Sequence, residues 1–327
     1  MKKTISLLLS LILILSLAAC MSVKTPQTAK SEPEPVVTPE PTAVPTATPA
    51  PTEVPADVAI ANATKKLAEV KSMHADMELT FDMELSLTMG ETSQNMPMDI
   101  NMTFAMDTTS DPEVARMDVA LSAMGENMNG VIYVAQEGEN TVLYSSDDEG
   151  VTWKKQVNPK NASLPQSSQE TLDTLVGPNA ARFERTGAQE VNGQPATVYT
   201  GKVDGKLLQD VLNSTGAAGE LTEAMGADLS AEELLSKLGD IDLTLMIDDA
   251  TGMPVRLVVD MTNAMKDLMM ASLLASMGAD SAEALQSAGL SIDVTTVVLD
   301  LTMSQFDAVE PIVIPEAALA AEATEAE

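Results

Sequence analysis

The sequence predicts an α+β protein organised around one long, strongly curved antiparallel β-sheet of about eleven strands, accompanied by short helices. The first reason is a strict alternation of apolar and polar residues from Met77 to Met89 and again from Met96 to Met106, which is typical of paired strands with one dry and one wet face. Each strand is roughly twice the usual length of about six residues, and a twisted sheet of such strands must curl. The second reason is that the connections that follow these two strands are too short for crossover helices, which makes the strands antiparallel.

The N-terminus has the pattern of an export signal. Lys2 and Lys3 precede an apolar run over 5–19 that is too short for a comfortable membrane span. The run ends in the residues LAAC, the last of which is Cys20. This ending resembles a bacterial lipobox, which implies a lipoprotein signal peptide over 1–19 and diacylglyceryl transfer to Cys20. An uncleaved anchor and an ordinary secretory signal are the alternatives. We expect Cys20 to anchor the chain to the extracytoplasmic face of the cell membrane, because two acyl chains hold a protein there stably.

Residues 20–57 are predicted to be the lipidated cysteine followed by a disordered, Pro/Thr-rich linker. Nine of the 18 prolines of the chain lie here, and such a composition favours extended polyproline II and cannot bury a core. The folded domain is expected over 58–315, with an acidic Ala/Glu tail over 316–327. The linker would then act as a stalk that lifts the domain away from the membrane.

Within the domain, the apolar spacing predicts the order of the elements. A helix capped by Asp57 carries an apolar stripe at Ile60, Ala63, Leu67 and Val70. The two long strands follow, with a turn over 90–95 between them. Further strands are expected at 117–123, 131–135, 141–144, 151–155, 181–186, 196–203, 241–248, 254–262 and 291–303, and further helices at 166–176, 205–213 and 231–238.

Two motifs carry a resemblance to a known family. They are the turn DDATGMPV over 248–255 and an ending in which Phe306 precedes the residues IVIPEA over 312–317. Together with the order of elements, they make residues 58–316 resemble the LolA/LppX-type fold, and more closely the uncharacterised LolA-like lipoproteins of Gram-positive bacteria. The resemblance implies a half-barrel whose concave face is covered by helices and holds lipid or acyl chains. It implies no catalytic residues.

The apolar face of the two long strands is the candidate site for a hydrophobic ligand. Methionine is long, unbranched and polarizable, so it suits both a soft core and a permissive lipid pocket. Thioethers also bind copper(I), but copper sites usually recruit His or Cys as well. The chain has one His and one Cys, so we predict no metal and no other cofactor. The predicted lining residues are Met77, Leu79, Phe81, Met83, Leu85, Met98, Ile100, Met102, Phe104 and Met106.

A methionine- and leucine-rich insertion over 263–290 precedes the final strand. Its apolar residues fall three or four apart, as they do on one face of a helix. Two interpretations stand: the helix packs on the sheet as an ordinary core element, or it forms a mobile lid over the ligand cavity. The lid candidates are Met265, Leu268, Met269, Leu273 and Met277.

The charge and the motifs exclude several function classes. The formal net charge of −31 argues against a nucleic acid partner and against electrostatic adhesion to anionic headgroups. No enzyme is expected, because His74 is the one histidine and no Gly-x-Ser-x-Gly, phosphate loop or zinc spacing accompanies it. Two hypotheses remain. One is a carrier or receptor that binds a lipid or acyl chain under the sheet; the other is a non-enzymatic interaction or sensory module with a solid core and a protein partner in the envelope.

Overall fold

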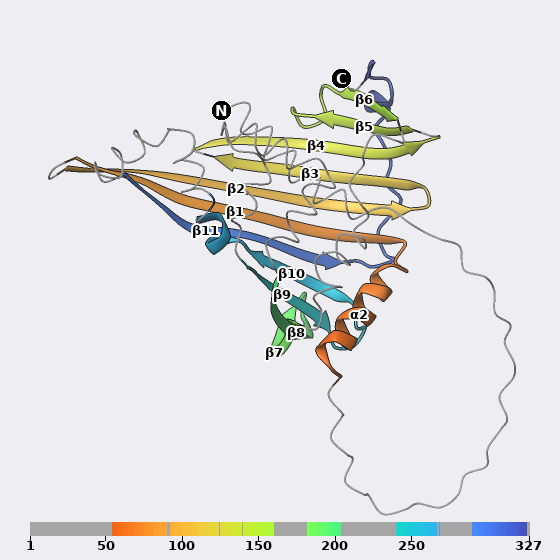
Figure 1. Cartoon of the computed structure of the whole chain (residues 1–327). Coiled ribbons are helices and arrows are strands. Elements are labelled where there is room, and N and C mark those ends of the chain that lie inside the picture. The colour runs from red at the N-terminus through yellow and green to blue at the C-terminus, as the bar shows by residue number, and fades with distance from the viewer. Residues whose placement is uncertain are drawn as a thin grey trace, which may run out of the picture.

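The computed structural model describes residues 54–89, 92–123, 125–138, 140–159, 182–203, 240–266, 268 and 290–325. Their strands form one twelve-stranded sheet in the order β12-β6-β5-β4-β3-β2-β1-β11-β10-β9-β8-β7 (Figure 1). All neighbours pair antiparallel except β12, which pairs parallel with β6. The predicted class, one open and curved antiparallel sheet with few helices, is therefore confirmed. No helix in the described ranges is long and apolar enough to cross a bilayer.

Three long strands at the centre set the dimensions of the sheet. They are β1 (Ser72–Met89), β2 (Thr92–Ser110) and β11 (Leu290–Ser304), with 18, 19 and 15 residues. β1 lies between the other two, and its Met77 stands opposite Phe104 of β2. Because side chains alternate between faces along every strand, the apolar residues of the neighbouring strands share one face. The alternation in the sequence predicted this arrangement.

The other strands follow the predicted order with shifted ends. The turn expected over 90–95 is shorter, since β2 already begins at Thr92. β7 lies later than the expected 181–186, and nearly all of its residues are exposed, so no apolar alternation marked it. The helices expected at 166–176, 205–213 and 231–238 lie outside the described residues. The remaining strands are β3 (Glu113–Ala123), β4 (Glu126–Glu137), β5 (Asn140–Ser146), β6 (Lys154–Pro159), β7 (Glu184–Val191), β8 (Gln194–Val203), β9 (Ile241–Asp248), β10 (Pro254–Asp260) and β12 (Ala323–Glu325).

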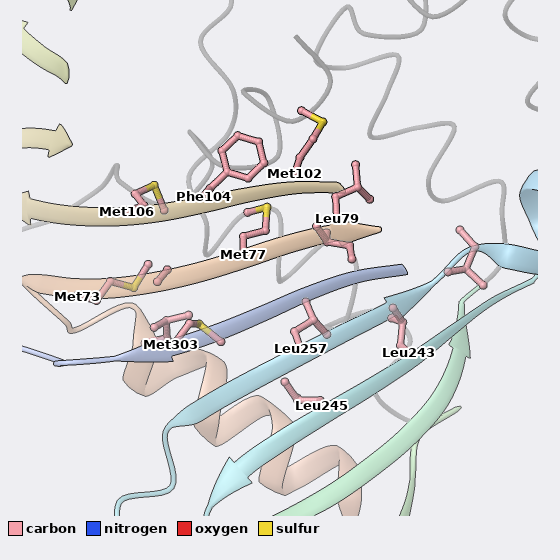
Figure 2. Close-up of a cluster of buried hydrophobic side chains, with 14 of the residues drawn as sticks. Met73, Met77, Leu79, Met102, Phe104, Met106, Leu243, Leu245, Leu257 and Met303 are labelled. Atoms are coloured by element: carbon pink, nitrogen blue, oxygen red, sulfur yellow. The ribbon is translucent and has the colours of Figure 1, made fainter. Parts of the chain in front are cut away.

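The apolar face of the sheet carries the main core. Figure 2 shows side chains from β1, β2, β9, β10 and β11 gathered on one side of the strands. Met102 on this face is fully buried, whereas its chain neighbour Thr103 is exposed. Burying one large apolar side chain stabilises a fold by about 1.5–3 kcal/mol, so this face holds the long strands together. Its buried members in Figure 2 include Met73, Met77, Leu79, Met102, Phe104, Met106, Leu243, Leu245, Leu257 and Met303.

Helix α2 (Ala56–Leu67) packs on the same core beside β10 (Figure 1). The predicted apolar stripe is confirmed, because Ile60 and Ala63 are buried within the core. The predicted cap is wrong: the N-cap residue is Pro55, and no side chain forms a cap hydrogen bond. Proline has a fixed φ that suits the entry to a helix. Asp57 therefore lies inside the first turn, where a carboxylate still interacts favourably with the helix dipole.

The residues after β11 pack on the opposite, polar face and extend the sheet. Helix α9 (Glu316–Leu319) is followed by β12, which joins the edge of β6. Ala318 and Tyr144 are both 0% exposed, and Ile312 packs on the same cluster. The sequence predicts an acidic tail over 316–327, but the structure places α9 and β12 within the domain. The reason is the cluster around Tyr144, which buries the small Ala318.

Candidate functional site

The ten residues predicted to line a hydrophobic cavity lie on one face of β1 and β2. The strand register pairs them across the hairpin, for example Leu79 with Met102 and Met83 with Met98. Six of the ten are buried: Met77, Leu79, Met83, Met102, Phe104 and Met106. The other four, which are Phe81, Leu85, Met98 and Ile100, are half-buried. The prediction that they share one dry face is confirmed; whether they line a cavity stays a prediction.

Exposure on this face rises toward the β1–β2 hairpin. Met102 is 0% exposed, but Met96 of the same strand is 59% exposed. The reason is the length of β3, which ends at Ala123 opposite Ile100, so that β2 continues beyond it with β1 as its neighbour. Figure 1 shows the two strands projecting beyond β3 and β4. We call the apolar residues at this end the distal patch: Phe81, Leu85, Met96, Met98 and Ile100.

The first turn of the insertion over 263–290 borders the distal patch. Residues 262–266 are helical, and Met261 and Met265 pack against a small cluster that includes Met83 and Val294. Leu268 is 1% exposed. Two lid candidates, Met265 and Leu268, therefore contribute to apolar packing. The other three, Met269, Leu273 and Met277, lie outside the described residues.

A hollow of about 610 Å³ lies on the polar face of the sheet, and two of the predicted lining residues, Met77 and Phe104, also border it. It spans β11, β1, β2, β3 and β4, and its lining includes Asp76, Glu78, Asp118 and Asp300. Several of these carboxylates have basic partners. Arg256 donates from Nε to Asp300 Oδ1 at 2.9 Å, and Arg116 lies 2.9 Å from Asp118. No group of three or more His, Cys, Asp or Glu side chains within the described ranges could hold a metal ion.

His74 at the start of β1 lies between two carboxylates on this polar face. Its Nδ1 is 2.7 Å from Asp107 Oδ1, and its Nε2 is 3.3 Å from Asp76 Oδ1. Burial by itself lowers the pKa of His74, but the hydrogen bond with Asp107 and the charge of Asp76 outweigh it and raise the pKa above 6.5. The protonated imidazole therefore stabilises the pairing of β1 with β2.

This geometry predicts a pH dependence of stability. Because the folded pKa of His74 is raised, its contribution is fully present below the unfolded pKa of about 6.5 and is lost as pH rises through the folded pKa. We expect a loss of up to about 1 kcal/mol in the free energy of unfolding, the upper end for a partly exposed ion pair. His74→Gln should remove this dependence in urea denaturation followed between pH 6 and 9. Identical pH profiles for the two proteins would contradict the assignment.

The chain matches the sequence model of a protein family. The model of a family of unknown function, DUF6612, matches residues 56–323. The chain belongs to this family. The match begins at the first residue of α2 and ends at the first residue of β12, so the DUF6612 domain includes the C-terminal segment that packs on the polar face. The search of curated proteins gave no match.

Solved structures resemble this DUF6612 domain in fold. LprF from Mycobacterium bovis is 14% identical, with a TM-score of 0.40, and the match covers 80% of this chain and 97% of LprF. The lipoprotein LppX from Mycobacterium tuberculosis is 12% identical, with a TM-score of 0.36 and coverage of 79% and 97%. A protein domain from Vibrio parahaemolyticus, named for outer membrane lipoprotein sorting, is 11% identical, with a TM-score of 0.17 and coverage of 70% and 83%.

Proposed function

We propose that the domain is a non-enzymatic binding protein that holds a hydrophobic ligand, such as an acyl chain, against the dry face of its sheet. The observation that carries the proposal is the distal patch. The same apolar face that forms the core continues along β1 and β2 into the half-buried Phe81, Leu85, Met98 and Ile100 and ends in Met96, which is 59% exposed. Exposed apolar patches on soluble domains commonly mark binding surfaces.

The chemistry of the patch supports a flexible apolar ligand. Covering apolar surface stabilises a complex by about 25 cal/mol per Å² removed from water. Met96 and Met98 are unbranched thioethers that adapt to ligands of different shape. Selectivity should therefore be low and set by the volume of the chain. Met261 and Met265 stand at the border of the patch and supply one apolar wall.

The central part of the dry face favours the second hypothesis, an interaction module with a solid core. Here the side chains themselves fill the space, since Met102 and Met303 are at most 1% exposed. A ligand bound only at the distal patch is compatible with this solid centre. A ligand that reaches the centre would have to displace core side chains, which costs the packing energy that holds the sheet.

A pair of matched variants tests the proposal. Met98→Asp places a carboxylate on the distal patch, whereas Asn95→Asp places the same charge on the polar face of the same strand. We expect Met98→Asp to weaken binding of an uncharged fluorescent acyl glycerol by about tenfold or more, because a desolvated charge then faces the chain. Asn95→Asp should change the affinity for the same probe by less than about twofold. Titrations with the mature-length chain, stripped of co-purified lipid, give the comparison.

The outcomes separate the two hypotheses. Equal affinities in the two variants would remove the distal patch from the site. If the stripped wild-type chain binds no acyl probe at micromolar concentration, the carrier proposal fails and the solid-core interaction module is the better account.

The proposal includes a lipid anchor at Cys20 on the extracytoplasmic face of the cell membrane. It rests on the LAAC ending of the apolar N-terminal run, which lies outside the described residues. Cys20→Ser should abolish labelling by a radioactive fatty acid and either release the protein or leave its precursor uncleaved. Ser22→Ala, two residues further on, should keep the labelling. Unchanged labelling of Cys20→Ser would reject the anchor.

A further inference from the structure

We infer that the distal patch selects ligands by the charge of their polar end, and prefers cationic or uncharged ends to anionic ones. The inference rests on the proposed function, since it concerns the same site. It comes from four carboxylates, which we call the rim acids: Asp82, Glu84 and Asp99, which alternate with the patch residues along β1 and β2, and Asp293 on the neighbouring strand β11.

The strand register gathers the rim acids on the polar face directly behind the patch. Asp82 of β1 stands opposite Asp99 of β2, and Glu84 stands opposite Asp293 of β11. Asp99 and Asp293 are exposed, and the β1 pair is half-buried. Like charges placed directly opposite each other destabilise a strand pair. The rim acids therefore lower the stability of the sheet, and folding alone does not explain why they are placed there.

Within the described residues, Lys266 is the base paired with a rim acid. Lys266, at the first turn of the insertion, has its Nζ 3.2 Å from Asp293 Oδ1 and so compensates that carboxylate. Within the described ranges, no ion pair involves Asp82, Glu84 or Asp99. Three uncompensated negative charges therefore lie about one sheet thickness, roughly 10 Å, from the patch. An acyl chain lying on the patch has its polar end in this field.

The size of the effect follows from Coulomb energies in water. Three charges at about 10 Å, screened as at low ionic strength, favour a monocation over a monoanion by about twentyfold in affinity. At physiological salt the preference should fall to about threefold, because the Debye length is then about 8 Å. An uncharged end should lie between the two.

The test compares three probes that share a twelve-carbon chain and differ at the polar end: the trimethylammonium, the glycerol monoester and the carboxylate. Each is titrated into the mature-length chain below its micellar concentration, at low and at physiological salt. We expect the affinity to fall in that order. The differences in affinity between the three probes should decrease as the salt concentration rises. The triple variant Asp82→Asn, Glu84→Gln and Asp99→Asn should bind the three probes with nearly equal affinity.

A second triple variant supplies the matched control. Glu184→Gln and Glu190→Gln on β7, together with Glu310→Gln, remove three exposed carboxylates elsewhere on the molecule. This control should keep the wild-type order, because it changes the net charge equally but leaves the rim acids in place. Equal binding of all three probes by the wild-type chain, or the same loss of preference in both variants, overturns the inference and leaves the proposed function standing. Binding of no probe at all overturns both.

Discussion

Replacing Met102 by aspartate should lower the free energy of unfolding by about 4 kcal/mol, because the new carboxylate has no partner in the core. Met102 is 0% exposed and stands between Leu79 of β1 and Leu121 of β3. An unpaired charge there must either remain desolvated or take up a proton, and both cost free energy. Urea denaturation of the two proteins measures the difference.

Two further substitutions make this prediction specific. Thr103→Asp, on the exposed face of the same strand, should cost less than about 0.5 kcal/mol, as ordinary surface sites do. Leu85→Asp on the distal patch should have an intermediate cost, because Leu85 is half-buried. Equal denaturation midpoints for Met102→Asp and Thr103→Asp would show that the faces of the sheet are assigned wrongly.

Replacing Asp248 by alanine should lower the free energy of unfolding by about 2–3 kcal/mol, the range for hydrogen bonds to a charged group. Asp248 is 6% exposed at the end of β9. Its Oδ1 accepts hydrogen bonds from the Thr251 N–H at 2.6 Å, the Thr251 hydroxyl at 2.6 Å and the Ala250 N–H at 3.1 Å. The turn also needs Gly252, whose φ of 68° is left-handed. Alanine leaves these donors without their acceptor.

Asp248 also makes the free energy of unfolding depend on pH in the acidic range. The hydroxyl of Thr251, followed by its backbone N–H, lowers the pKa of Asp248. Its contribution is therefore present above the unfolded pKa of about 3.9 and is lost as pH falls through the folded pKa. Asp248→Asn should lose this part of the acid dependence. The exposed neighbour Asp249, which accepts a hydrogen bond from Thr197, is the control. A decrease in the free energy of unfolding in Asp249→Ala as large as that in Asp248→Ala would contradict the role of Asp248.

Much of the fold could be predicted because the information is local. Strict alternation from Met77 to Met89 and from Met96 to Met106 specifies two strands and their two faces, since a slip by one residue would turn every apolar side chain to water. The turn over 249–252 could be predicted in the same way, because it combines a hydrogen-bonding Asp248 with Gly252. Such signals do not depend on what the rest of the chain does.

Other features could not be predicted, because they depend on segments far away in the chain. Ala318 carries no periodic pattern, and it is buried because Tyr144 of a distant strand lies beneath it. The hollow on the polar face likewise combines residues of five strands. No local sequence signal marks either feature.

The sequence by itself determined that Met96, Met98 and Met102 share the dry face of one strand. Only the tertiary structure decided that Met102 is fully buried while Met96 is 59% exposed. The three residues have the same chemistry and the same alternation. Their difference arises because β3 ends at Ala123, opposite Ile100, so that among the described strands β2 pairs beyond this point with β1 alone. Burial is a property of the surroundings of a residue, and here those surroundings come from the length of another strand.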